Sequence, residues 1–192
     1  MAEPAPSTVL APGAYQRILD HFQAPLARFV RALVSNGEDA RDIVQDVFVD
    51  GWRAAQRGAP PFTEGGTDRA IRNWLYHAAY CDAVSVLRRR SVIAWESLDG
   101  SDYVEDIERH SPQPFEDRVV ERAELRAALA TLEPADLGCL RLGVVEDFTS
   151  IEMAQILGIT PEAARKRLSR AMHRLRGAYF AQRDAVREVE RP

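Results

Sequence analysis

Apolar residues recur three and four positions apart along most of the chain, which is the spacing of one face of an α-helix. This spacing defines seven predicted helices, at about residues 14–34, 38–57, 68–90, 116–131, 135–145, 150–157 and 161–180. No stretch alternates over a useful length with the period of two that marks a half-buried strand. The pattern therefore predicts an all-α fold.

Glycine and proline mark where these segments should turn. The Asn36-Gly37 pair predicts the turn between the first two helices, and residues 58–61 (Gly-Ala-Pro-Pro) begin a longer loop before the third. Pro25 lies inside the first predicted helix, where a proline removes a backbone hydrogen bond. We therefore expect the first helix to kink or break at Pro25.

Residues 149–176 carry the start and stop signals of two helices joined by a tight turn. Thr149 can cap the first helix while Glu152 reaches back to the backbone amide of the cap. Gly158 favours the left-handed backbone that ends a helix, and Thr160-Pro161 can start the next one. The inward side of the first helix is expected to consist of Ile151, Ala154 and either Ile156 or Leu157. These signals predict a helix-turn-helix.

The second helix of this motif is strongly basic. Residues 161–176 contain six Arg or Lys and one Glu, a net charge of +5, in a chain whose formal net charge is −4. The inward face is predicted to consist of Ala164, Leu168, Ala171 and Leu175, with Met172 beside them. Arginines on the other faces can contact DNA phosphates and guanine edges in the major groove. A basic face that contacts only solvent is the alternative.

Charge divides the chain into three parts. Residues 1–92 carry 11 basic and 10 acidic residues, residues 93–117 carry one and eight, and residues 118–192 carry 13 and 11. Because an acidic segment separates two nearly neutral blocks, we expect the blocks to fold separately. The predicted division is an N-terminal tail at 1–13, a helical domain at 14–92, an acidic linker at 93–115, a helix-turn-helix domain at 116–178 and a C-terminal tail at 179–192.

The second predicted helix carries a row of carboxylates. Four aspartates lie at three-and-four spacing on one side, while apolar residues occupy the others. The acidic residues are Asp39, Asp42, Asp46 and Asp50, and the apolar ones are Ile43, Val44, Val47, Phe48 and Trp52. Such a row can bind a cation or a basic partner surface, although a solvated face is an equally ordinary interpretation.

The third predicted helix combines aromatic residues with three consecutive arginines, Arg88 to Arg90. Aromatic rings stack on unpaired bases and arginines hold phosphates, so the helix is a plausible surface for single-stranded nucleic acid. In the alternative interpretation, Trp74 and Leu75 belong to the core and the arginines favour a helix C-terminus.

Several classes of function lack support in the sequence. No catalytic triad spacing or phosphate-cradling glycine loop occurs, so we expect no enzymatic activity and no cofactor. Cys81 and Cys139 are isolated, as expected for reduced, buried thiols. His77 and Cys81 could share a helical face and ligate a metal, but no second pair of ligands stands nearby, so no metal site is predicted. Neither a membrane span nor a secretory signal is found, which predicts a cytoplasmic protein without membrane insertion.

Three segments together resemble a known family. They are residues 38–48, residues 73–90 and residues 151–176, and their order and spacing are those of bacterial RNA polymerase sigma factors of the small extracytoplasmic-function group. These proteins keep only regions two and four. The resemblance covers roughly residues 14–92 and 116–178. It implies an all-helical protein that binds core RNA polymerase and directs it to promoters.

The resemblance also implies site residues. The core polymerase would contact Asp39, Asp42, Gln45, Asp46 and Phe48 through its clamp helices. The −10 promoter element would be melted and held by Phe62, Trp74, Tyr76, His77, Tyr80, Arg88, Arg89 and Arg90. The −35 element would be contacted by Thr160, Arg165, Lys166, Arg167, Ser169, Arg170 and Arg174. Implied partners are the polymerase clamp helices and flap, promoter DNA and an anti-sigma factor.

This chain departs from the family pattern at three places. Cys81 stands where an asparagine is common near the flipped base, and the loop between Arg57 and Asp68 is longer than usual. Met172 stands where a third arginine is common in the recognition helix. Two other functions remain open from the residues alone. One is a stand-alone helix-turn-helix transcriptional regulator, and the other is an adaptor that docks polymerase through the acidic helix without contacting DNA.

Overall fold

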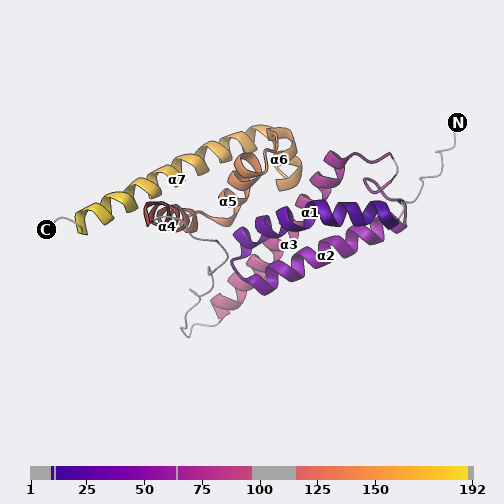
Figure 1. Ribbon diagram of the computed structural model, residues 1–192, viewed down its shortest axis with the longest axis horizontal. Coiled ribbons are helices and arrows are strands. Elements are labelled where there is room, and N and C mark those ends of the chain that lie inside the picture. The colour runs from indigo at the N-terminus through magenta and orange to yellow at the C-terminus, as the bar shows by residue number, and fades with distance from the viewer. Residues whose placement is uncertain (1–9, 11, 64, 97–115, 190–192) are drawn as a thin grey trace. The chain divides into compact units, whose positions relative to one another are not determined.

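The protein is helical throughout the part of the chain that the structure describes (Figure 1). The structure is a computed structural model that describes residues 10, 12–63, 65–96 and 116–189. Within these residues it contains seven α-helices and one short π-helix, and no strand. The predicted all-α fold is confirmed. Among the same residues, no helix combines the length and the hydropathy that a membrane crossing requires.

The chain divides into two compact units (Figure 1). The first unit contains α1 (Pro12–Val34), α2 (Gly37–Gln56) and α3 (Asp68–Glu96), and each of these helices packs against the other two. The second unit contains α4 (Glu116–Ala130), α5 (Pro134–Leu140), the π-helix η1 (Arg141–Val145), the first part of α6 (Ser150–Leu157), and α7 (Pro161–Val189).

Two helices are longer than predicted. Helix α3 continues to Glu96, four residues into the predicted linker, and α7 continues to Val189, into the predicted C-terminal tail. Residues 97–115, which make up the rest of the predicted linker, lie outside the described residues. Pro25 lies within α1 and does not end it, so of the expected kink or break, the break is wrong.

A further difference concerns the segment predicted as one helix at residues 135–145. It begins as α5 and then widens into η1, where the backbone amide of Glu146 donates to the carbonyl of Arg141, five residues earlier, at 3.0 Å. Gly143 lies in this wider turn, close to neighbouring side chains. A Cβ atom at Gly143 would lie 2.9 Å from Leu168 Cδ2 and 3.1 Å from Met153 Sδ. The wider turn therefore occurs where α5 meets two other helices, and helical spacing alone does not reveal it.

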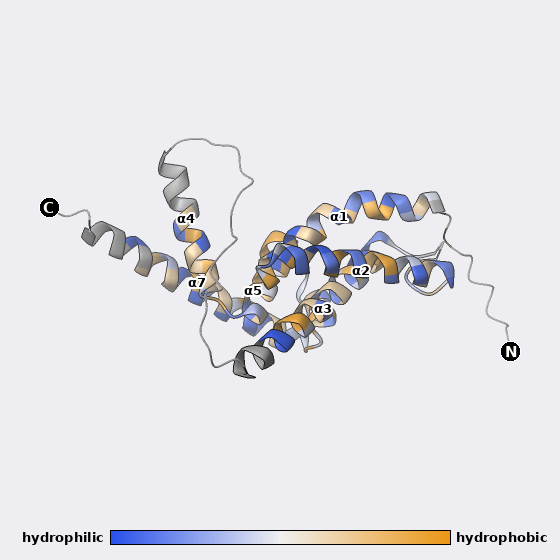
Figure 2. Cartoon of the chain, turned by 90° about the horizontal axis from the view of Figure 1, so that it is seen from below, coloured by the Kyte–Doolittle hydropathy of each residue, from blue (hydrophilic) through white to orange (hydrophobic). Residues whose placement is uncertain are grey.

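The core of the first unit is built from the inward faces of its three helices. Hydrophobic and hydrophilic residues alternate in bands along α1 and α2, as expected for amphipathic helices (Figure 2). The fully buried side chains include Leu26, Phe29, Val30, Val47, Leu75 and Tyr76. The N-terminus of α2 is capped by Asn36, whose Oδ1 accepts from the amides of Glu38 and Asp39 at 2.8 and 3.1 Å.

An aromatic cluster closes one end of this core. The Phe62 ring, which is fully buried, lies 4.9 Å from the Trp74 ring and 6.0 Å from the Tyr15 ring. The Tyr15 hydroxyl donates to the backbone carbonyl of Phe48 at 2.5 Å, which joins α1 to α2. Burial of this hydroxyl raises the pKa of Tyr15 to about 12. Phe62 therefore holds the loop before α3 against the helices.

The core of the second unit lies between α7 and the helices α4 and α5. It consists of Leu132, Leu140 and Ala171, with Leu129, Leu137, Leu168 and Leu175 packed against them. The Sγ atom of Cys139, which is fully buried, donates to the carbonyl of Ala164 at 3.5 Å. Cys81, in contrast, is exposed, so the prediction that both thiols are buried is wrong for Cys81.

Gly51 is where we expect the first unit to be most sensitive to one added methyl group. A Cβ atom there would lie 2.7 Å from the Tyr15 hydroxyl oxygen and 3.2 Å from Phe62 Cζ. Gly51→Ala should therefore lower the free energy of unfolding by roughly 1 to 2 kcal/mol, even after the gain in helix propensity. The measurement is denaturant unfolding followed by tryptophan fluorescence. All three tryptophans of the chain belong to the first unit, so the signal reports on that unit.

Gly37→Ala is the matched control in the same helix, since no atom outside the helix lies within 4 Å of a Cβ at Gly37. It should leave the unfolding midpoint unchanged or raise it. Equal behaviour of the two variants would contradict the packing described around Gly51.

Candidate nucleic-acid and polymerase interfaces

The predicted helix-turn-helix is present, and each of its local signals has the expected partner. The amide of Thr149 donates to Glu152 Oε2 at 2.8 Å, and the amide of Glu152 donates to Thr149 Oγ1 at 3.4 Å. Gly158 has a φ of +66°, which lets the chain turn after α6. Thr160 Oγ1 accepts from the amide of Ala163 at 3.2 Å and caps α7. The capping box and the glycine turn are confirmed.

The inward face of α6 differs from the expectation at one position. Ala154 is buried, but Ile151 is 61% exposed. Ile151 shares this exposure with Val144 and Val145 of η1, which are each 56% exposed. A helix of eight residues has only about two turns. The spacing of its apolar residues therefore does not decide which side is buried until the neighbouring helices are known.

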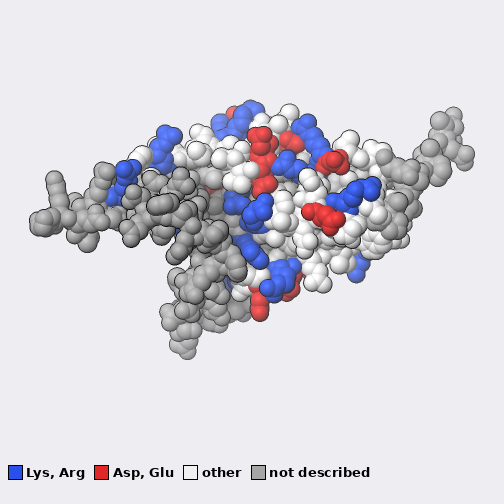
Figure 3. Space-filling view, in the orientation of Figure 1, with Lys and Arg blue, Asp and Glu red and all other residues white. Residues whose placement is uncertain are grey.

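The N-terminal half of α7 separates an apolar side from a cationic side. Ala164 and Ala171 are fully buried against the rest of the second unit. Four residues predicted to contact the −35 element are exposed, namely Arg165, Lys166, Ser169 and Arg170. Lys166 Nζ lies 2.9 Å from Glu162 Oε1, and Arg170 Nε donates to the carbonyl of Lys166 at 3.4 Å, so both side chains lie along the helix. Lys and Arg side chains lie along α7 on the face shown in Figure 3.

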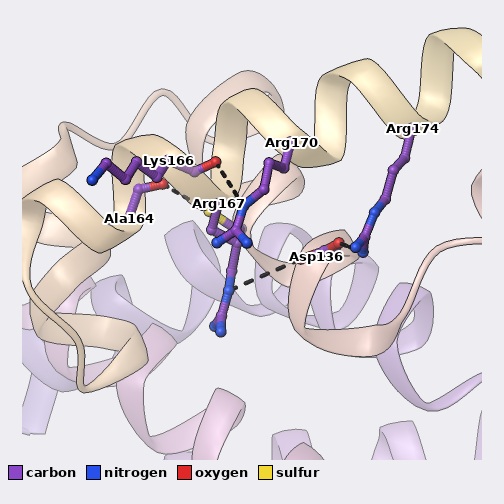
Figure 4. A network of polar contacts seen from close by, with 7 residues as sticks. Asp136, Ala164, Lys166, Arg167, Arg170 and Arg174 are labelled. Atoms are coloured by element: carbon purple, nitrogen blue, oxygen red, sulfur yellow. Dashed lines mark hydrogen bonds and ion pairs between the residues drawn. The ribbon is translucent and has the colours of Figure 1, made fainter.

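Two other predicted −35 residues point elsewhere. Arg167 and Arg174 are directed toward Asp136 in the first turn of α5 (Figure 4). Arg174 Nη1 donates to Asp136 Oδ2 at 2.5 Å, and Arg167 Nε lies 3.9 Å from Asp136 Oδ1. Asp136 is only 7% exposed. The sequence pattern did not reveal this carboxylate, because it lies on a different helix.

The acidic helix α2 places only part of its predicted site on the surface. Asp42, Gln45 and Asp46 are exposed. Asp39 is half-buried, and its Oδ2 lies 2.5 Å from Arg90 Nη2 at the far end of α3. This ion pair joins a residue predicted to contact polymerase to one predicted to contact the −10 element.

Phe48 belongs to the core of the first unit and not to its exposed surface. Its side chain is 7% exposed, and its carbonyl accepts the Tyr15 hydroxyl. Phe48 is therefore mostly buried, and its contact with polymerase remains a prediction. Helical spacing placed Phe48 among the apolar residues of this helix, and only the family resemblance implied that it contacts polymerase.

The predicted −10 surface on α3 is also reduced by burial. Phe62 is fully buried and Tyr76 is 1% exposed, so both are core residues and not surface contacts. Trp74 and Tyr80 are half-buried, with the Trp74 ring edge-on to Phe62. The exposed members of the predicted set are His77, Arg88, Arg89 and Arg90. The alternative interpretation, which placed Trp74 and Leu75 in the core, holds for Leu75, which is fully buried.

Sequence reasoning missed a groove between α1 and α2. Its volume is about 820 Å³, and its apolar lining includes Leu19, Val44 and Trp52. Arg31 and Arg41 also line it, and none of the described lining residues is a carboxylate. Gln45 and Phe48 belong to the same lining, so the groove adjoins the predicted polymerase surface. A groove of this kind depends on how two helices pack and has no signature in either helix alone.

Asp82 extends the acidic surface from α2 onto α3. Its pKa is raised by partial burial, and also by the nearby carboxylates of Asp46 and Asp50, while Arg89 opposes the shift. These effects place Asp82 beside the α2 row. Only the packing of α3 on α2 brings the three carboxylates together.

The exposed thiol of Cys81 lies beside His77, with 3.8 Å between Sγ and Nε2. Across the described ranges, no group of three or more His, Cys, Asp or Glu residues is arranged to hold a metal ion.

A helix-turn-helix with a cationic second helix, together with a separate three-helix unit, defines a helical DNA-binding protein. The sequence matches the family descriptions "Sigma-70 region 2" over residues 18–92 and "Sigma-70, region 4" over residues 122–175, which together span more than half of the chain. The chain therefore belongs to the sigma-70 family, in its extracytoplasmic-function group. It is an RNA polymerase sigma factor that serves transcription initiation.

Similar proteins share this architecture. The RNA polymerase sigma factor NccH of Alcaligenes xylosoxydans xylosoxydans is 27% identical over 166 residues, 84% of each chain. The extracytoplasmic-function sigma factor SigE of Mycolicibacterium smegmatis is 28% identical over 151 residues, 78% of this chain and 55% of that protein. The solved structure of the sigma factor RpoE with the anti-sigma factor NepR from Bartonella quintana has a TM-score of 0.66 at 23% identity, covering 85% of this chain and 95% of RpoE.

The two cysteines should differ sharply in reactivity. Burial raises the pKa of Cys139 to about 11, whereas Cys81 is exposed and can be reached by reagents. Because the thiolate is the nucleophile, iodoacetamide at pH 8 should alkylate Cys81 at least about tenfold faster than Cys139 in the native chain. Peptide mass spectrometry over time measures both rates, and 6 M guanidinium chloride is the control in which the rates should converge. Equal rates without denaturant would contradict the burial of Cys139.

Proposed function

We propose that this sigma factor recognises promoters in two places, with the second unit contacting the −35 element and the first unit contacting core polymerase and the −10 element. The observation that carries this proposal is the cationic surface of α7, where Arg165, Lys166, Ser169 and Arg170 are exposed on the second helix of the helix-turn-helix. An α-helix fits the major groove of duplex DNA, and an arginine there can donate two hydrogen bonds to a guanine. We accordingly assign duplex recognition to these four residues, with Thr160 at the N-terminus of α7.

The first unit would dock core polymerase through α2. Asp42, Gln45 and Asp46 supply exposed polar groups, and the adjoining groove between α1 and α2 supplies apolar surface. Interfaces of this kind combine an apolar centre with a charged rim that orients the partner. The clamp helices of polymerase are the proposed partner of this surface, and the flap is the proposed partner of the second unit.

The −10 strand would run along α3. His77, Arg88 and Arg89 are exposed, and Trp74 and Tyr80 are half-buried with part of each ring at the surface. Arginines can hold the phosphates of a melted strand while aromatic rings stack on its bases. Phe62 and Tyr76 would support this surface from the core.

Regulation by an anti-sigma factor is part of the same proposal. The solved structure of RpoE contains the anti-sigma factor NepR, and its fold matches this chain over most of both lengths. A partner that covers the groove between α1 and α2 would compete with core polymerase for the first unit. Each of these roles is a binding role, exercised in the cytoplasm where core polymerase and promoter DNA are found.

The family matches favour the sigma factor over a stand-alone helix-turn-helix regulator, because the first unit corresponds to sigma-70 region 2. The deciding experiment mixes the purified chain with bacterial core polymerase and a library of promoter fragments. We expect transcripts that start at defined sites only when the chain and core polymerase are both present. Tight operator binding by the free chain, without any effect on core, would favour the regulator.

Charge reversal at Asp46 tests the polymerase surface. Asp46→Lys should lower the affinity for core polymerase by about tenfold, because it replaces an exposed carboxylate of the docking face with a cation. The fold should tolerate the change, since Asp46 already raises the pKa of Asp82 by repulsion. Affinity is measured by titrating labelled protein with core.

Asp68→Lys is the matched control, because Asp68 is an exposed carboxylate in the first turn of α3 that neither belongs to the α2 row nor lines the groove. It should bind core as the unmodified chain does. If both variants lose affinity, the effect at Asp46 comes from the change in net charge and not from its position. That result would refute the assigned surface.

Replacement of Arg170 tests sequence recognition by α7. Arg170→Ala should weaken −35 recognition in the holoenzyme by about 1 to 3 kcal/mol if the arginine contacts a base. Arg176→Ala, on the same helix, removes an exposed cation that lies outside the assigned set. Competition between promoter fragments with intact and scrambled −35 elements measures the effect. An equal loss on both fragments would show that Arg170 contacts only phosphate.

A further inference from the structure

Asp136 is a buried carboxylate at the contact between α5 and α7. Among the described residues, only Asp136 and Glu152 are charged and buried, and Glu152 is engaged with Thr149 at the cap of α6. Asp136 instead faces two arginines of α7 (Figure 4). The three groups form one network across two helices.

The network orients both arginines toward the body of the unit. Arg174 donates to Asp136 Oδ2 at 2.5 Å, and Arg167 lies 3.9 Å from Asp136 Oδ1 with its side chain 31% exposed. A guanidinium that donates to a carboxylate is satisfied without a phosphate, and moving both arginines to DNA would leave a buried carboxylate unpaired. This cost opposes the use of Arg167 and Arg174 as phosphate contacts.

The two arginines differ from the other cations of α7 in their shared partner, Asp136. Arg167 and Arg174 are seven residues apart, two turns of α7, and so lie on one face, which Arg170 shares at three and four residues from them. Arg165, Lys166 and Arg170 are exposed and make no ion pair with Asp136 in the described structure. Arg174 is paired with Asp136 although its side chain is 54% exposed, so ion pairing, and not burial, distinguishes the two groups of cations.

We propose that Asp136 is a positioning residue that withholds Arg167 and Arg174 from DNA phosphates and thereby limits the sequence-independent affinity of α7. The inference rests on the proposed role of α7 in reading the −35 element. Phosphates are present at every site, so two phosphate contacts fewer weaken binding to all duplexes by about the same amount and lower its salt dependence. Asp136 therefore lowers the sequence-independent affinity of the recognition helix by neutralising part of its charge.

The test is the salt dependence of binding to a fluorescent duplex of random sequence, measured with the full chain at several KCl concentrations. Each phosphate contact contributes about −0.9 to the slope of log Kobs against log salt. Asp136→Asn should release the arginines, steepen the slope by about 1 to 2, and tighten binding to the random duplex several-fold.

Arg174→Gln makes the test independent of how well the Asp136 variant folds. In the unmodified chain this replacement should leave the slope unchanged, because Arg174 is held by Asp136. In the Asp136→Asn background it should reverse about one unit of the added slope. Arg176→Gln, a neighbouring exposed cation, is the control for general loss of charge and should act equally in both backgrounds.

Three outcomes would overturn the inference. One is an unchanged or shallower slope for a folded Asp136→Asn chain, which would mean that Asp136 supports phosphate contacts. Another is a slope shallower by about one for Arg174→Gln alone. The third is an absence of duplex binding by every chain at the lowest salt. The proposed function is tested separately, by initiation that depends on core polymerase. If initiation is not observed, the comparison of salt slopes still tests the role of Asp136.

Discussion

The close packing of α7 on α5 is the constraint on which the second unit depends. Small residues at Ala164 and Ala171 let the helix axis approach its neighbours, and Leu168 fills the space beside Gly143. Close approach brings the Cys139 thiol to the carbonyl of Ala164. Because this packing fixes one side of α7, its other sides keep a constant orientation relative to α5. A helix that recognises DNA requires such a constant orientation.

The same packing explains why the cations of α7 are not equivalent. Asp136 pairs with Arg167 and Arg174, while Arg165, Lys166 and Arg170 make no ion pair with it among the described residues. A count of basic residues measures the electrostatic attraction of a helix, but the number available to phosphates depends on what its neighbours neutralise. In the first unit, the Asp39–Arg90 pair has a comparable effect, since it occupies two charges that would otherwise belong to separate surfaces.

Whether a prediction from the sequence held depends on how far apart along the chain the interacting groups lie. The capping box at Thr149, the glycine turn at Gly158 and the cap at Thr160 were predictable because each involves groups within a few residues. Ile151 was expected to face inward and is exposed, whereas Phe48 and Phe62, which the resemblance implied as contact residues, are buried. Whether such a residue is core or surface depends on a second element far away in the sequence. The π-helix at η1 was likewise hidden, since its cause is packing around Gly143.

The amino-acid sequence by itself determined the helical class, the helix-turn-helix, the concentration of positive charge on its second helix and the resemblance to sigma factors, because these depend on local spacing, capping and composition. Tertiary structure alone decided which of the candidate site residues reach solvent. It assigned Phe48, Phe62 and Tyr76 to the core, joined Asp82 to the acidic row of α2, formed the groove between α1 and α2, and turned Arg167 and Arg174 toward Asp136. The physical reason is that burial and ion pairing are properties of two packed helices, and neither helix alone specifies its partner.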